Sequence, residues 1–301
     1  MSLTPRLPKL PAQIHNFRTF QRHLVSAAAA ACPLLEAACQ IPLAHDFDDL
    51  TSRVLRGHLV RGWKLYDATV ALYKRGKGDV AHNLTRGLME LLINMDYLLH
   101  APDRYAAARG FVCRSASHLL QPIAYLEKQV AIPEDVNNPT THDRDEWARS
   151  IGPSVDLEAK ATWLLSQAGV LRENQQAQEF LKSDRAGTLT SAWPASVKER
   201  AMTPMAQDIY NVWYAKSCLT LHLNWEIMKW QDLQLGDRYE PDSRWFFDDS
   251  EDLIEVTEVT LAVFTEQLLA LGGDEATELA EGLATIVAWF VRAQATMHAS
   301  I

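Results

Sequence analysis

A row of polar side chains interrupts one of the most apolar stretches of the sequence, "RGLMELLINMDYLL" at residues 86–99. Arg86, Glu90 and Asn94 follow one another at intervals of four, and His82 lies one interval earlier. Residues four apart lie on the same side of a helix, so these side chains form a polar stripe. A buried arginine needs hydrogen-bonding partners, because an unpaired buried charge is costly. The stripe therefore predicts a second polar surface that faces it.

The segment 205–233, which we expect to form one long helix, is the best candidate for that second surface. It carries polar and aromatic side chains on an apolar background: Tyr210, Tyr214, Ser217, His222 and Glu226. Ser217 and His222 are five residues apart, so they lie on different faces of a helix and cannot pair as nucleophile and base. We expect Arg86 and Glu90 to contact this segment. The two helices then enclose a polar pocket that binds a small ligand or a protein partner.

A structural interpretation of the same residues stays open. A polar network between two helices can fix their register without binding anything, and function would then depend on other surfaces. A concave pocket lined by Arg86, Glu90, Tyr214 and His222 would favour binding, whereas a closed, dry network would favour the structural role.

The elements that position these residues are all expected to be helices. Apolar residues recur at helical spacing along most of the chain, and no segment alternates with period two for long. We predict an all-α fold, a mostly antiparallel helical bundle with a loop-rich insertion, in a single domain over residues 1–301. Its parts are an N-terminal arm at 1–16, helices at 18–39, 46–76 and 79–100, an irregular insertion at about 131–203, and a C-terminal helical pair at about 250–298, split near residue 272.

Charge and composition restrict the classes of partner. The 301 residues include 29 Lys and Arg against 38 Asp and Glu, a net charge of −9, so we expect no DNA partner and little affinity for RNA. No apolar stretch approaches the length that a membrane span requires. The four cysteines form no CxxC pair, which fits a reducing cytoplasm better than a disulfide scaffold or a zinc knuckle. A cytoplasmic protein without a membrane partner is the expectation.

Motifs for common chemistries do not occur in the sequence. It contains no GxxxxGK[ST], GxSxG or HExxH, and no Glu-x-x-His of the kind that di-iron bundles use. The acidic run at 246–252 reads as helix-terminal charge, with Asp248 and Asp249 capping a helix rather than holding magnesium. We therefore predict no metal site and no cofactor. The sequence does not decide whether the protein is an enzyme, although it favours a non-catalytic role.

The stretch from residue 71 to residue 113 resembles a bacterial all-helical family of unknown function. Members of that family carry a short glycine turn, an Arg-x-x-x-Glu helix and then a helix that begins near "PDRYAAAR". Tyr214, Ser217 and His222 match the Tyr-x-x-Ser…His helix that follows later in the family. The sequence departs from the family after the histidine, where Leu223 stands in place of the usual small residue. That departure weakens any shared chemistry at His222.

Such bundles are distantly similar to HEPN domains, which often form dimers in prokaryotic toxins and defence systems. This resemblance implies an alternative function, a metal-independent ribonuclease, and a homodimer as an alternative assembly. Active HEPN ribonucleases use an Arg-x(4–6)-His motif, in which histidine transfers protons and arginine binds phosphate. Here His222 would work with Arg86 or with an arginine of the basic segment 53–86. The sequence has four such spacings, roughly twice the number expected by chance: Arg18–His23, Arg53–His58, Arg75–His82 and Arg292–His298.

Overall fold

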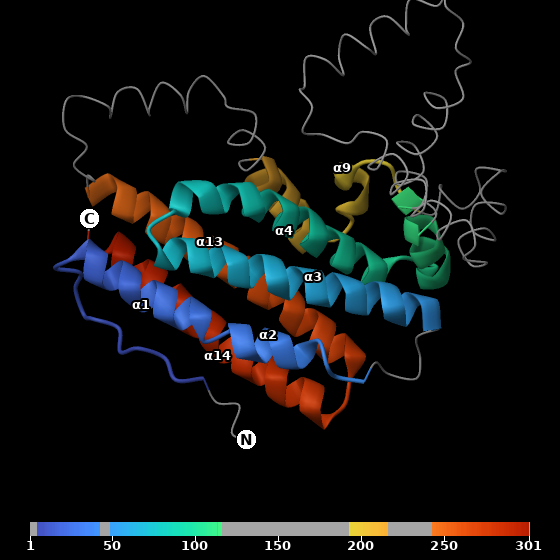
Figure 1. The fold of residues 1–301 in the computed structure, drawn as a ribbon, viewed down its shortest axis with the longest axis horizontal. Coiled ribbons are helices and arrows are strands. Elements are labelled where there is room, and N and C mark those ends of the chain that lie inside the picture. The colour runs from blue at the N-terminus through green and yellow to red at the C-terminus, as the bar shows by residue number, and fades with distance from the viewer. Residues whose placement is uncertain (1–4, 43–48, 113, 116–192, 216–242, 301) are drawn as a thin grey trace, which may run out of the picture. The chain divides into compact units, whose positions relative to one another are not determined.

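The computed structural model describes residues 5–42, 49–112, 114–115, 193–215 and 243–300 (Figure 1). All regular elements in these residues are helices, so the predicted all-α fold is confirmed. The chain divides into two compact units, one formed by 1–105 with 196–301 and the other by 106–195. In the second unit, the ring of Phe111 packs edge-on against Trp193 at 5.0 Å between ring centroids. The single-domain organisation stays a prediction.

Two short helices stand where the sequence predicted one helix over 18–39. Helix α1 spans Phe17–Ala29, and the Asn16 side chain caps it by accepting a hydrogen bond from the backbone N–H of Thr19. Helix α2 spans Cys32–Ala38 and has Pro33 in its first turn. Proline has no N–H to donate to the carbonyl four residues earlier, and its ring clashes with that carbonyl. A continuous helix is therefore disfavoured at Ala29, where α1 ends.

Helices α3 (Asp49–Lys74) and α4 (Gly78–His100) match the two helices predicted at 46–76 and 79–100. A tight glycine turn joins them. Gly76 has φ 67°, a left-handed conformation that glycine adopts without steric cost. The N–H of Lys77 donates to the carbonyl of Leu72 at 2.9 Å, and the N–H of Gly76 donates to Tyr73, which together form a Schellman motif.

The C-terminal pair consists of α13 (Ser243–Leu271) and α14 (Asp274–His298), which pack extensively against each other. Gly272 and Gly273 turn the chain between them at φ 70° and 89°. Helix α13 begins well before Asp248 and Asp249, so the prediction that these residues cap it is wrong. After Pro241 no glycine or proline interrupts the sequence before the Gly272–Gly273 turn, so nothing prevents an early helix start.

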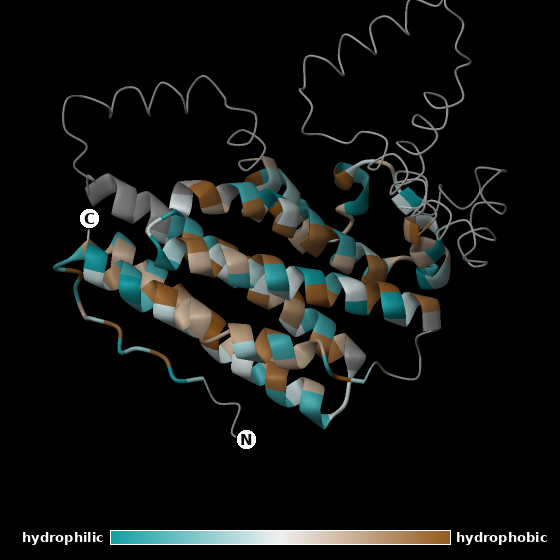
Figure 2. Cartoon of the chain, in the orientation of Figure 1, coloured by the Kyte–Doolittle hydropathy of each residue, from teal (hydrophilic) through white to brown (hydrophobic). Residues whose placement is uncertain are grey.

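Three helices of the first unit meet closely at Gly62 of α3. A Cβ atom added there would lie 3.0 Å from side-chain carbons of both Leu91 in α4 and Phe264 in α13. Nearby, the fully buried Tyr66 donates its hydroxyl hydrogen bond to the carbonyl of Ala28 at 3.1 Å, which ties α3 to α1. Both hydropathy colours appear on these helices in Figure 2, as expected of amphipathic helices around a shared core.

The N-terminal arm lies along α14. The Trp289 indole N–H donates to the carbonyl of Pro8 at 2.8 Å, and the N–H of Ile14 donates to the Ser300 hydroxyl at 3.2 Å. Among the described helices, none combines the length and the hydropathy that a membrane crossing requires.

The segment 197–214 contains one separate short helix and a second helical stretch that begins at Pro204, close to the start predicted at 205, and continues from an α-helix directly into a π-helix. The three elements are α9 (Val197–Arg200), α10 (Pro204–Asp208) and the π-helix η3 (Ile209–Tyr214). Residues 216–242 lie outside the described residues, so the rest of the predicted 205–233 helix is not placed. All three elements contact α4, which brings them to the polar stripe.

Candidate functional site

Local capping fixes the two short helices that reach α4. Ser196 caps α9, and a reciprocal hydrogen bond from its N–H to Glu199 completes a capping box. Thr203 caps α10 by accepting from the N–H of Ala206, and Pro204 occupies the first turn. A four-residue helix such as α9 is not stable alone, so contacts with α4 must hold it in place.

Arg200, at the end of α9, is the main partner of the polar stripe. Only 4% of its surface is exposed. Its Nε donates to Oδ1 of Asn94 at 2.8 Å, and its Nη2 donates to Oε1 of Glu90 at 3.2 Å. We call these three residues the Arg200 network. The partner that the structure describes for Glu90, Arg200, lies before the 205–233 segment. The expected contact of Glu90 with that segment stays a prediction.

Arg86 does contact the predicted segment, through an aromatic ring. Its guanidinium carbon lies 5.6 Å from the centroid of the Tyr214 ring, within the range of a cation–π interaction. Tyr214 in turn stacks on Tyr210, with centroids 5.5 Å apart and ring planes inclined by 20°. All three side chains are partly exposed. We call them the Arg86–tyrosine surface.

The other predicted site residues are not brought into this geometry. His82 lies on α4, but its side chain is not among the described ones. Ser217, His222 and Glu226 lie outside the described residues. Of the predicted set, the structure thus brings together Arg86 with Tyr210 and Tyr214, and separately Glu90 with Asn94.

His58 shows how one of the arginine–histidine spacings is used. The imidazole is 5% exposed, and its Nδ1 lies 2.8 Å from the carbonyl of Val54 in the same helix. Burial lowers the pKa of His58, and the charge of Arg200 lowers it further. Arg53, by contrast, is exposed. A buried imidazole and an exposed arginine do not form a shared phosphate-binding surface, so this spacing does not favour the ribonuclease interpretation.

A second polar group on α4 was not anticipated from the sequence. Asp96 is fully buried, and its Oδ2 accepts a hydrogen bond from the Thr203 hydroxyl at 2.9 Å. Its Oδ1 has no hydrogen-bond donor among the described residues. Burial raises the pKa of this carboxyl group, whereas the bond from Thr203 opposes that shift.

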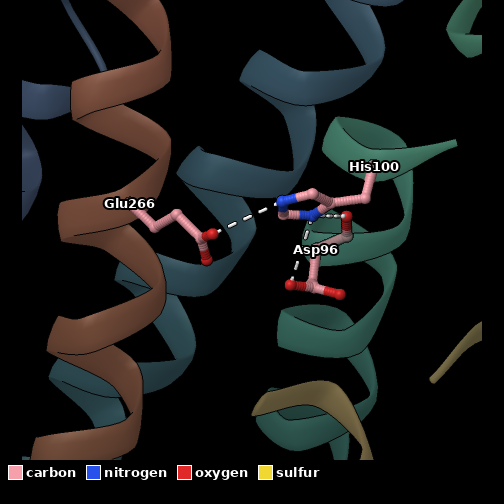
Figure 3. Close-up of side chains that lie close together, drawn as sticks. All are labelled: Asp96, His100 and Glu266. Carbon is pink, nitrogen blue, oxygen red and sulfur yellow. Dashed lines mark hydrogen bonds and ion pairs between the residues drawn. The ribbon is translucent and has the colours of Figure 1, made fainter. Parts of the chain in front are cut away.

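His100 lies between Asp96 and Glu266 of α13, as Figure 3 shows. Its Nδ1 is 2.9 Å from the backbone carbonyl of Asp96 and 3.5 Å from Asp96 Oδ1. Its Nε2 faces Oε1 of Glu266 at 3.4 Å. We call the three residues the Asp96 cluster. The four-residue spacing of Asp96 and His100 could have been noticed in the sequence, but only the packing of α4 on α13 brings in Glu266.

The chain was compared with known protein families. The model of a family of unknown function, DUF5677, matches residues 52–238, more than half of the chain. The chain belongs to this family, and the resemblance to an uncharacterised helical family is thereby confirmed. No curated protein and no solved structure matches the chain significantly.

Proposed function

We propose that this member of the DUF5677 family is a binding protein, which holds a protein partner on the Arg86–tyrosine surface. The observation that carries the proposal is the packing of a partly exposed arginine against two stacked, partly exposed tyrosines. Tyrosine and arginine dominate the energetically important positions of protein–protein interfaces, because each combines a large contact area with hydrogen-bonding groups. The proposal also includes Ser217, His222 and Glu226, which the sequence analysis assigns to the same pocket.

The surroundings of this surface support a recognition role. Val212, which belongs to the same π-helix as both tyrosines, is 49% exposed. A π-helix turn widens the backbone and is frequent at functional sites. One turn away on α4, Glu90 and Asn94 hold the buried Arg200 and so fix the position of α9. A surface supported in this way loses little conformational freedom when a partner binds.

The test compares partner binding by the parent chain and by two variants whose thermal stability is checked to match that of the parent. The first variant, Arg86→Gln with Tyr214→Leu, removes the charge and one ring of the surface. The control variant, Arg292→Gln, removes an exposed arginine from α14. Each tagged full-length protein is used as bait in an extract of the source organism, and retained proteins are quantified by mass spectrometry. We expect at least one protein to be retained by the parent and the control but lost from the double variant.

Native mass spectrometry of the same preparations separates the other outcomes. If only the double variant fails to carry a small molecule, the Arg86–tyrosine surface binds that molecule and not a protein partner. A dimer of the parent that the double variant alone fails to form would make a second copy of the chain the partner. If the double variant is folded and retains every protein, ligand and subunit of the parent, the proposal is wrong and the polar stripe is structural.

A further inference from the structure

We propose that Asp96, His100 and Glu266 form a binding site for one divalent transition-metal ion of the zinc class. The site goes beyond the proposed partner surface and does not depend on it. One ligand atom from each of the three residues can be chosen so that all lie within 4.8 Å of one another. Zinc is bound by imidazole nitrogens and carboxylate oxygens at about 2.0–2.2 Å. Side-chain rotations that shorten the longest of these separations to about 3.4 Å would bring the three atoms onto one ion.

The orientation of the His100 ring is the first argument for an ion. The Asp96 carbonyl can only accept a hydrogen bond, so the nearby Nδ1, at 2.9 Å, must carry the proton. The other ring nitrogen, Nε2, faces Oε1 of the Glu266 carboxylate at 3.4 Å. Two electron-pair donors that face each other at this distance repel unless a cation or a proton lies between them. The separation also equals the spacing of neighbouring ligands around a tetrahedral ion with bonds of about 2.1 Å.

Asp96 supplies the second, independent argument. It is fully buried, and its Oδ1 lies 3.5 Å from Nδ1 of His100 without receiving a hydrogen bond from any described residue. A buried carboxylate oxygen without a donor is costly, and a bound cation would remove that cost. The other oxygen, Oδ2, is already held by the Thr203 hydroxyl at 2.9 Å. Metal-binding carboxylates are typically oriented by such a hydrogen bond from a neighbouring residue.

A hydrogen bond of the same kind orients the histidine. Metal-bound histidines usually donate their second ring N–H to a carbonyl or a carboxylate, which fixes the tautomer and aims the free nitrogen at the ion. Nδ1 of His100 makes this contact with the Asp96 backbone. The cluster thus has three ligand side chains and hydrogen bonds that position two of them.

Solvent access and ligand chemistry indicate the class of ion. The His100 side chain is 40% exposed and that of Glu266 41% exposed, so an ion can enter and water can complete its coordination. Magnesium and calcium prefer ligand sets made of oxygen alone, whereas imidazole favours zinc and its neighbours in the first transition series. Three protein ligands and one water match the pattern of an open zinc site.

The chain offers a matched control in a second histidine–glutamate pair. Nε2 of His298 in α14 lies 3.7 Å from Oε1 of Glu251 in α13, with side chains 52% and 34% exposed. Asp96, by contrast, completes a group of three at His100. Loss of His298 should therefore leave the proposed site intact.

The experiment is a calorimetric titration of the metal-free, full-length protein with Zn²⁺. The variants are His100→Gln, Glu266→Gln, Asp96→Asn and the control His298→Gln, each checked for folding by circular dichroism in EDTA. We expect the parent to bind one ion at this site. The first three variants should weaken that binding about tenfold or more, while the control changes it less than about threefold. With Co²⁺ in place of Zn²⁺, the visible absorption bands of the bound ion should disappear in His100→Gln.

Three results would overturn the proposal. The first is a parent protein that binds no Zn²⁺ more tightly than about 1 mM. The second is equal binding by the parent, His100→Gln and Glu266→Gln, which would place the ion elsewhere. The third is an equal loss in His298→Gln, which would indicate general surface binding. Because His100 and Glu266 are both partly exposed, unfolding of Asp96→Asn alone leaves two variants that decide the question.

Discussion

Replacing Arg200 by methionine should loosen the α9–α10 segment from α4. The substitution keeps most of the aliphatic side chain but removes both hydrogen bonds of the Arg200 network, to Asn94 and to Glu90. Since α9 has only four residues, the loss should appear as local opening of this segment before global unfolding.

The expected size of the effect follows from the burial of each partner. The bond from a 4% exposed guanidinium to the Asn94 amide should contribute about 1.5–2 kcal/mol, as bonds to charged groups do. The pair with Glu90 should contribute only about 0.5–1 kcal/mol, because the Glu90 side chain is 41% exposed and its charge is screened by water and salt. The sum, about 2–3 kcal/mol, corresponds to a rise of about 30-fold to 150-fold in local opening.

Hydrogen exchange measured by mass spectrometry on peptides covering residues 197–208 tests this estimate. Arg200→Lys should fall between the parent and Arg200→Met, because it retains the charge but not the planar fork that reaches two acceptors. Lys198→Met, an exposed change in the same helix, is the control and should alter protection by less than about 0.5 kcal/mol. In a double-mutant cycle with Glu90→Gln, the coupling should be about 0.5–1 kcal/mol and should shrink in high salt. If Arg200→Met exchanges as slowly as the control, the Arg200 network does not hold this segment.

Two further predictions concern the packing and the pH dependence of the bundle. Gly62→Ala should lower stability by about 1–3 kcal/mol, because its Cβ would press on Leu91 and Phe264. Gly57 lies in the same helix, and nothing lies within 4 Å of a Cβ added there, so Gly57→Ala should raise stability by about 0.4–1 kcal/mol. Urea denaturation of both variants measures the two changes in the free energy of unfolding. Burial raises the pKa of Glu258 above its ordinary value of 4.5, so this group stabilises the fold below that pH and loses its contribution as pH rises through the folded pKa. Glu258→Gln should therefore melt above the parent at pH 7 and level with it at pH 4, and a difference that does not change with pH would contradict this.

The fold was predictable because the long helices have clear apolar periodicity in the sequence and are separated by glycine turns. The boundaries of α3, α4 and α14 follow from Gly76 and from the Gly272–Gly273 pair. The errors arose where local chemistry was misread. Pro33 divides the first predicted helix, and α13 extends upstream of the acidic residues that were expected to cap it.

The candidate site was only partly predictable, for a different physical reason. Periodicity along one helix shows which residues share a face, so the stripe Arg86–Glu90–Asn94 could be recognised, and so could its need for partners. Periodicity does not identify the partner, because a contact such as Arg200 to Asn94 joins residues 106 positions apart. For the same reason, the sequence did not indicate that Glu266 lies beside His100. The short α9 has too few residues to show a periodic pattern.

The question of why so apolar a helix as α4 carries polar residues can be answered from both of its polar groups. Glu90 and Asn94 hold Arg200, and Asp96 holds the Thr203 hydroxyl, so two partners three residues apart are anchored to one helix. Apolar contacts alone would not fix the direction of the short α9 and α10, because such contacts are non-directional. Hydrogen bonds with buried partners do fix it, since a shifted segment would leave Arg200 and Asp96 unsatisfied. The polar residues of α4 therefore set the register of the segment that carries Tyr210 and Tyr214, and in this way they position the surface on which we propose that a partner binds.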